Sequence, residues 1–192
     1  RKAGCYNLNL KTKVGPVRDE EGRFLPALDF PDMKALADYV HSYGLKIGIY
    51  SGPGETTCQI FEASYGHEFI DAETFAQWGY DLLKYDLCAY RKIWEVMKGD
   101  KQQNRSFPFR LMGGILEKQD RDIVYNICEY GYQVWEWGKA AGGHLWRIGE
   151  DLGHTVTEGG FYEIAKKTIE LRAYNGPGSW NDRSEERRVG KE

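Results

Sequence analysis

Short apolar segments alternate with amphipathic segments along most of this chain, and that alternation constrains its fold more than any other feature. Residues 32–44 carry apolar side chains at helical spacing and end on a glycine, and residues 45–50 are short and rich in Ile and Tyr. This order predicts a helix followed by a strand. The order recurs, with helices expected at 71–78, between 91 and 118 and at 161–174, and strands at 5–10, 80–85, 122–128 and 145–148.

Alternating helices and strands predict a parallel sheet with helices outside it, as an open doubly wound sheet or a (β/α)₈ TIM barrel. None of the glycine motifs that bind dinucleotides or nucleoside phosphates follows a strand, so the barrel is favoured. A complete barrel takes about 250 residues, and only five or six strands are expected in these 192 residues. We therefore expect an incomplete α/β barrel domain over residues 1–182. Residues 183–192 are mostly charged and are expected to be a tail outside the fold.

Composition excludes several classes of function. A formal net charge of -3 gives no basic field for a nucleic acid. No apolar run reaches the roughly 20 residues that cross a membrane. The 4 Cys and 4 His lack the spacing of metal ligands, so no metal site is expected. No start Met or signal-peptide pattern precedes the first residue, so the chain is expected to begin inside a longer one.

Polar side chains stand at the expected strand ends, where parallel sheets and barrels build their sites. They are Tyr50, Lys84, Asp86, Glu129, Arg147, Glu150, Asp151 and Asp182. Alternation puts Lys84 and Asp86 on the same strand face, where the cation favours an ionised carboxylate. The alternative is an ion pair that only closes the rim of the barrel. Paired carboxylates in different surroundings are typical of enzymes that cleave glycosidic bonds.

Several strings in the chain resemble glycoside hydrolase family 27, the α-galactosidase family, over almost all of residues 3–182. They are ALADYVHSYGLKIGIYS (35–51), TTC (56–58), FAQWGYDLLKYDLC (75–88), RDIVYNICEYG (121–131), WR (146–147) and GPGSWND (176–182). The strings K-Y-D-x-C and G-P-G-x-W-N-D are the specific ones. The resemblance implies a TIM-barrel glycosidase of the retaining class that acts on a carbohydrate and needs no cofactor.

The resemblance also implies roles for individual residues. Asp86 matches the nucleophile, and Asp151 matches the general acid/base; Glu150 is a rival on sequence alone, but the family spacing after Arg147 selects Asp151. Positions that line the sugar pocket are matched by Tyr50, Lys84, Glu129, Arg147 and Asp182. Glu129 fits a site that reads a free 2-hydroxyl group, which favours galactose over an N-acetylated sugar.

The family joins the matches of Cys58 and Cys88 as a disulfide beside the pocket, whereas Cys5 and Cys128 have no evident partner. If this bridge forms, a secreted, periplasmic or lysosome-like compartment is favoured. The sequence does not predict an oligomeric state.

The chain departs from the family pattern in three places. Leu10 and Lys11 stand where the family has two adjacent Asp residues that grip the outer hydroxyl groups of galactose. Ser184 replaces a further Asp, and the first and last barrel strands and the C-terminal β domain are expected to be missing. These departures leave open a β-L-arabinopyranosidase, an α-N-acetylgalactosaminidase and a catalytically dead sugar-binding remnant.

Overall fold

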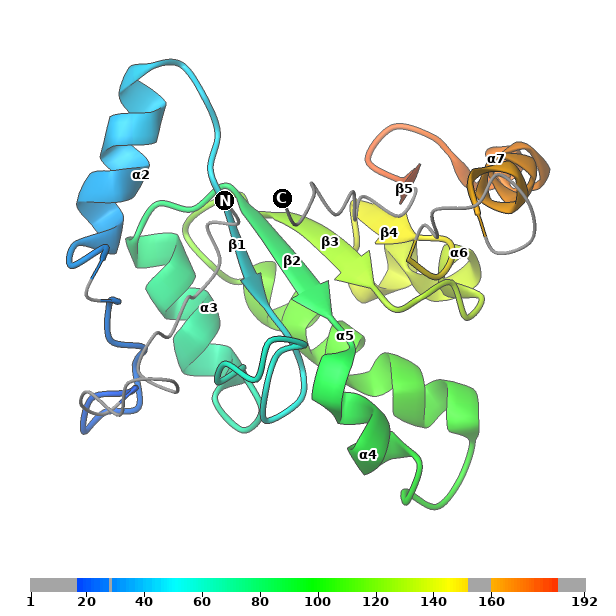
Figure 1. Cartoon of the computed structure of the whole chain (residues 1–192), viewed down its shortest axis with the longest axis horizontal. Coiled ribbons are helices and arrows are strands. Elements are labelled where there is room, and N and C mark those ends of the chain that lie inside the picture. The colour runs from blue at the N-terminus through cyan, green and yellow to red at the C-terminus, as the bar shows by residue number, and fades with distance from the viewer. Residues whose placement is uncertain (1–16, 28, 152–159, 183–192) are drawn as a thin grey trace, which may run out of the picture.

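The structure is a computed structural model that describes residues 17–27, 29–151 and 160–182. Its centre is a five-stranded parallel sheet in the order β1-β2-β3-β4-β5, so neighbouring strands are consecutive in the sequence (Figure 1). The strands are β1 Gly48–Ser51, β2 Leu82–Asp86, β3 Val124–Cys128, β4 Leu145–Arg147 and β5 Trp180–Asp182. Consecutive parallel strands need crossover connections, which helices supply here.

The described helices are α2 Met33–Ser42, α3 Glu68–Gln77, α4 Arg91–Trp94, α5 Lys101–Leu116, α6 Val134–Trp137 and α7 Phe161–Glu170. Short 3₁₀ turns occupy Cys88–Tyr90, Lys139–Ala141 and Arg172–Tyr174. Within the described ranges, no helix combines the length and the apolar character needed to span a bilayer.

The two faces of the sheet differ in chemistry. In β2, Leu83 and Tyr85 point toward the helical layer, where the Tyr85 ring meets the Phe109 ring of α5 edge-on at 5.9 Å. Figure 1 shows α3 and α5 side by side on this face. Because side chains alternate along a strand, Lys84 and Asp86 point to the opposite face. The apolar core therefore leaves the other face of the sheet to polar residues.

The α/β fold and the parallel sheet predicted from the sequence are confirmed, with shifts of one to three residues at the strand ends. The first helix ends at Ser42 and is followed by Gly44 in the left-handed region at φ 70°, as its C-terminal signal indicates. The expected strand 45–50 starts only at Gly48, since Leu45 is exposed and pairing begins at Gly48.

Several sequence-based expectations fall outside the described residues. These are the strand at 5–10, the substituted positions Leu10, Lys11 and Ser184, Cys5, and the charged tail 183–192.

Candidate active site

The register of the sheet collects the predicted site residues at its carboxyl end. Tyr50 of β1 is level with Lys84 of β2, and Asp86 is level with Cys128 at the end of β3. In the last two strands of the sheet order, Arg147 of β4 is level with Asp182 of β5. Residues from all five strands thus lie at the carboxyl end of the sheet, where parallel α/β folds build their sites.

Asp86 is the buried carboxylate at the centre of this group, with 5% of its surface exposed. The phenol of Tyr50 donates a hydrogen bond to Oδ2 at 2.8 Å, and the phenol of Tyr130 donates one to Oδ1 at 2.8 Å. Burial and the negative charge of Asp86 raise the pKa of both phenols, so both keep their protons and act as donors. The two bonds fix the orientation of the carboxylate.

A disulfide lies directly beside this carboxylate. Cys58 and Cys88 are bonded, with their Cα atoms 5.1 Å apart, which confirms the expected pairing. The Cys88 sulfur lies 3.2 Å from the Tyr50 hydroxyl, and the Cys58 sulfur lies 3.6 Å from the Tyr130 hydroxyl. Each phenol that binds Asp86 therefore also touches one sulfur of the bridge.

The backbone after β1 approaches β2 closely at Gly52. A Cβ atom at this position would lie 2.3 Å from the carbonyl oxygen of Asp86, so only glycine fits. This close approach brings the loop that carries Cys58 against the end of β2.

Glu129 directly follows β3 and is completely buried. It forms an ion pair with Arg105 of α5, and its Oε2 atom accepts the backbone N–H of Tyr132 at 2.8 Å. Burial raises the pKa of Glu129 to about 7, although Arg105 and the Tyr132 N–H favour the ionised form. The side chain can therefore accept or donate a hydrogen bond close to neutral pH.

Arg147 links the end of β4 to the loops around it. Its guanidinium is buried, donates to the Gly149 carbonyl oxygen at 2.8 Å and to the Cys128 sulfur at 3.4 Å, and pairs with Asp151. The same guanidinium lies 4.7 Å above the Tyr130 ring. Tyr130 thus contacts Asp86 through its hydroxyl and the partner of Asp151 through its ring.

Glu150 and Asp151 have different surroundings although they are adjacent. The Asp151 side chain is 60% exposed and pairs with Arg147, whereas Glu150 lines a separate hollow of about 340 Å³ with Glu163, Lys166 and Lys167. Of these two carboxylates, Asp151 pairs with Arg147, whose guanidinium covers the Tyr130 ring beside Asp86.

Lys84 and Asp182 also face this network. The Lys84 ammonium lies 5.6 Å from the centre of the Tyr50 ring. The Asn126 side-chain amide donates to Asp182 Oδ2 at 3.2 Å. These contacts place both charged groups on the polar face of the sheet.

Sequence reasoning missed two residues of this network, Tyr130 and Arg105. Tyr130 directly follows Glu129 at the end of a predicted strand, and this position could have marked it as a candidate site residue. Arg105 lies in the N-terminal part of α5, where no feature of the sequence marks it. Tyr85 of β2 and Trp146 of β4, on strands that lead to the site, are buried core residues.

One group of described residues has the donor atoms of a metal site. The sulfurs of Cys58 and Cys88 and a carboxylate oxygen of Asp86 lie within 4.8 Å of one another. Because the two sulfurs are bonded to each other, neither can act as the thiolate that a metal would bind. These residues do not fit a metal ion.

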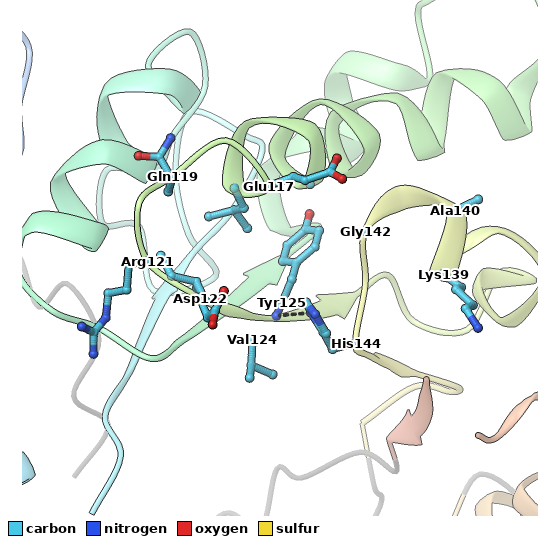
Figure 2. Close-up of a pocket in the computed structure, with 13 residues that line it drawn as sticks. Glu117, Gln119, Arg121, Asp122, Val124, Tyr125, Lys139, Ala140, Gly142 and His144 are labelled. Carbon is cyan, nitrogen blue, oxygen red and sulfur yellow. Dashed lines mark hydrogen bonds between the residues drawn. The ribbon is translucent and has the colours of Figure 1, made fainter. Parts of the chain in front are cut away.

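A cavity of about 510 Å³ lies at the opposite end of the strands from the Asp86 network (Figure 2). Its lining includes Val124, the first residue of β3, and His144, which precedes β4 and accepts the Tyr125 backbone N–H through Nδ1 at 3.0 Å. Arg121 and Lys139 border it on opposite sides in Figure 2. This cavity is at the amino ends of the strands, away from the Asp86 network.

Known proteins resemble this chain over most of its length. The family model for alpha galactosidase A matches residues 4–187. The alpha-galactosidase A of Cellvibrio japonicus is 39% identical over an alignment of 195 residues. The alignment covers 95% of this chain and 45% of that protein. The chain therefore spans less than half the length of this relative.

Two solved structures show the same likeness. Alpha-galactosidase I from Mortierella vinacea superposes with a TM-score of 0.74 at 30% identity, over 86% of this chain and 45% of that one. The α-galactosidase from Saccharomyces cerevisiae, solved with raffinose, superposes with a TM-score of 0.71 at 26% identity, over 87% and 41% of the two chains.

Proposed function

Because the chain belongs to the alpha-galactosidase A family, glycoside hydrolase family 27, we propose that it forms the catalytic part of a retaining glycosidase that releases terminal α-linked galactose. One observation carries the proposal: a buried carboxylate, Asp86, is oriented by two phenols at the carboxyl end of a parallel strand. The raffinose bound by the yeast relative supports an oligosaccharide as the substrate class.

In the proposed reaction, Asp86 attacks the anomeric carbon while Asp151 gives a proton to the departing oxygen. Water then attacks the glycosyl–enzyme, and Asp151 takes the proton of this water. Retaining enzymes need the two carboxyl groups about 5–5.5 Å apart, and we expect this separation when substrate is bound. The ion pair with Arg147 holds the Asp151 side chain next to the network that contains Asp86.

The sugar-binding roles are part of the same proposal. Tyr50, Lys84, Glu129, Arg147 and Asp182 would contact galactose, with Cys58 at the edge of the pocket. Glu129 would bind the 2-hydroxyl group, as the family resemblance implies; it directly follows β3, is buried and is held by Arg105. An N-acetyl group at this sugar position would need space that a carboxylate occupies.

We further propose that the five described strands belong to an eight-stranded barrel whose other strands are outside the described residues. Two observations support this. The sheet of five strands is open, and the matched part is less than half of each of the two similar structures. Residues 1–182 would form the incomplete part of this barrel domain that the chain contains, with 183–192 as a tail. The disulfide supports maturation in an oxidising compartment.

Turnover of p-nitrophenyl α-galactoside by the full-length protein tests the proposal. Proton NMR of the first product should show α-galactose, and Asp86→Asn and Asp151→Asn should each lose most of the activity. Asp38→Asn, an exposed carboxylate on α2, is the matched control and should keep it. Preferred cleavage of a β-L-arabinopyranoside or an N-acetylgalactosaminide, or binding of galactose without turnover, would contradict the proposal.

A further inference from the structure

Tyr130 contacts Asp86 directly and has no role in the reaction proposed above. Its hydroxyl donates to Asp86 Oδ1 at 2.8 Å, while Tyr50 supplies the other oxygen. The two oxygens of the proposed nucleophile therefore each receive a phenol. One of these oxygens must bond to carbon in the first chemical step and leave it in the second.

The backbone holds Tyr130 in place at an energetic cost. Its φ of 64° lies in the left-handed region, which is rare for residues with a side chain and which recurs at functional sites. Gly131 follows at φ 81°, and a Cβ atom there would lie 2.2 Å from the Ile148 carbonyl oxygen. The loop is also tied to α5, because Arg105 donates to the Glu129 carbonyl oxygen at 3.0 Å.

The surroundings of the phenol keep it a donor. The hydroxyl is 3.6 Å from the Cys58 sulfur, and the Arg147 guanidinium covers the ring at 4.7 Å. Burial and the charge of Asp86 raise the pKa of Tyr130, so it keeps its proton across the working pH range. Its one hydrogen therefore remains directed at Asp86.

We propose that Tyr130 is a positioning residue that promotes the second chemical step by stabilising Asp86 as a leaving carboxylate. The proposal rests on the proposed function. In the first step, an Asp86 oxygen bonds to the anomeric carbon and the glycosidic bond breaks. In the second, water bonds to that carbon, the bond to Asp86 breaks, and its electron pair returns to the carboxylate. Hydrogen bonds to ionised groups are about twice as strong as those between neutral groups. The phenol thus favours the free carboxylate over the ester.

Removal of the hydroxyl should therefore separate the two steps. In Tyr130→Phe, Asp86 remains a competent nucleophile, but breakdown of the glycosyl–enzyme slows by about 10-fold, the equivalent of about 1.4 kcal/mol in the barrier. With 2,4-dinitrophenyl α-galactoside, kcat and KM should fall together while kcat/KM stays near the wild-type value. Rapid mixing should show a burst of one dinitrophenolate per active site, and azide should raise kcat by intercepting the glycosyl–enzyme.

Two further proteins complete the test. Tyr39→Phe removes an exposed phenol on α2 and should behave as wild type. Site-specific 3-fluorotyrosine at position 130 makes the phenol a stronger donor without changing its shape, so breakdown should be faster than in wild type; this holds whether or not the Phe variant folds.

The outcomes separate the inference from the proposed function. A raised KM with a lower kcat/KM and no burst would assign Tyr130 a structural role only and overturn the inference, as would unchanged kinetics. In both cases, wild-type turnover that is lost in Asp86→Asn would still support the proposed function. Absence of turnover in wild type, or full activity in Asp86→Asn, would overturn both.

Discussion

The two buried carboxylates of the site have different partners. Asp86 receives two phenol hydrogen bonds, whereas Glu129 is closed in behind an arginine and a backbone N–H. Hydrogen bonds favour a charged carboxylate and burial disfavours it. A carboxylate with phenol donors suits attack on carbon, and a carboxyl group that titrates near neutrality suits recognition of a hydroxyl group.

The raised pKa of Glu129 predicts a pH effect on stability. Between 4.5, its ordinary pKa, and about 7 in the fold, the folded protein holds more protons than the unfolded chain. Stability from this group is therefore full below 4.5 and is lost as pH rises through 7. Glu129→Gln mimics the protonated form, so urea unfolding should show wild type losing stability relative to this variant between pH 5 and pH 8.

Glu117→Gln, at the exposed end of α5, is the matched control for this experiment. A stability difference between Glu129→Gln and wild type that stays constant from pH 5 to pH 8 would show that the carboxyl group is ionised throughout.

The sequence predicts the residues whose position follows from a strand end or from a segment that resembles the family. Examples are Tyr50, Asp86 and the Cys58–Cys88 pair. The contact of Tyr130 with Asp86 could not be predicted, because it depends on a left-handed backbone that brings the side chain back over the sheet. The pairing of Arg105 with Glu129 depends on the way α5 packs against the end of β3. Both are tertiary effects that local patterns do not encode.

At the scale of elements, Asp81 joins three segments just before β2. Its carboxylate accepts from His41 of α2 at 2.7 Å, from Arg121 at 2.7 Å, from Lys46 at 3.2 Å and from the Ile47 backbone N–H at 3.0 Å. Burial alone would raise the pKa of Asp81, but these hydrogen bonds hold it well below its usual range. This residue anchors the end of the sheet opposite the site.

Asp81→Asn should therefore destabilise the protein without altering the chemistry of the site. Loss of charge-assisted hydrogen bonds should cost about 1.5–3 kcal/mol in the free energy of unfolding, measured by urea denaturation at pH 7. Asp38→Asn removes an exposed pair with Lys34 and should change it by less than about 1 kcal/mol.

The pH dependence of this difference gives a second check. A depressed pKa contributes stability that is present above the ordinary value of 3.8 and is lost as pH falls toward the lower pKa of the folded state. Wild type and Asp81→Asn should therefore converge below pH 3.8. Equal stabilities at pH 7 would show that the cluster adds nothing.

Elements with strong local signals could be predicted from the sequence, and those that depend on partners could not. Helix α2 has an apolar stripe and a capping Asp32, whose Oδ1 accepts the Ala35 N–H at 2.8 Å. Trp180–Asp182 lies in a Gly-rich segment and forms a strand only by pairing with β4. The start of β1 is likewise set by its register with β2 rather than by its own residues.

At the scale of the whole molecule, the sheet is open within the described ranges, with β1 and β5 as its outer strands. Unpaired strand edges and apolar surface promote association; Trp180 in β5 and Val124 in β3 are 54% and 41% exposed. We expect the isolated 192-residue chain to aggregate and to show weak turnover. Cooperative unfolding of that chain, with turnover equal to that of the full-length protein, would contradict this expectation.

The identity of the nucleophile is the claim on which the proposed mechanism depends most. Treatment of the full-length protein with 5-fluoro-α-galactosyl fluoride should trap the glycosyl–enzyme, because the fluorine slows its breakdown. Peptide mass spectrometry should then locate one added sugar on Asp86, with none in Asp86→Asn. A sugar attached to another residue, or a protein that turns over α-galactosides while Asp86 stays unlabelled, would contradict the assignment.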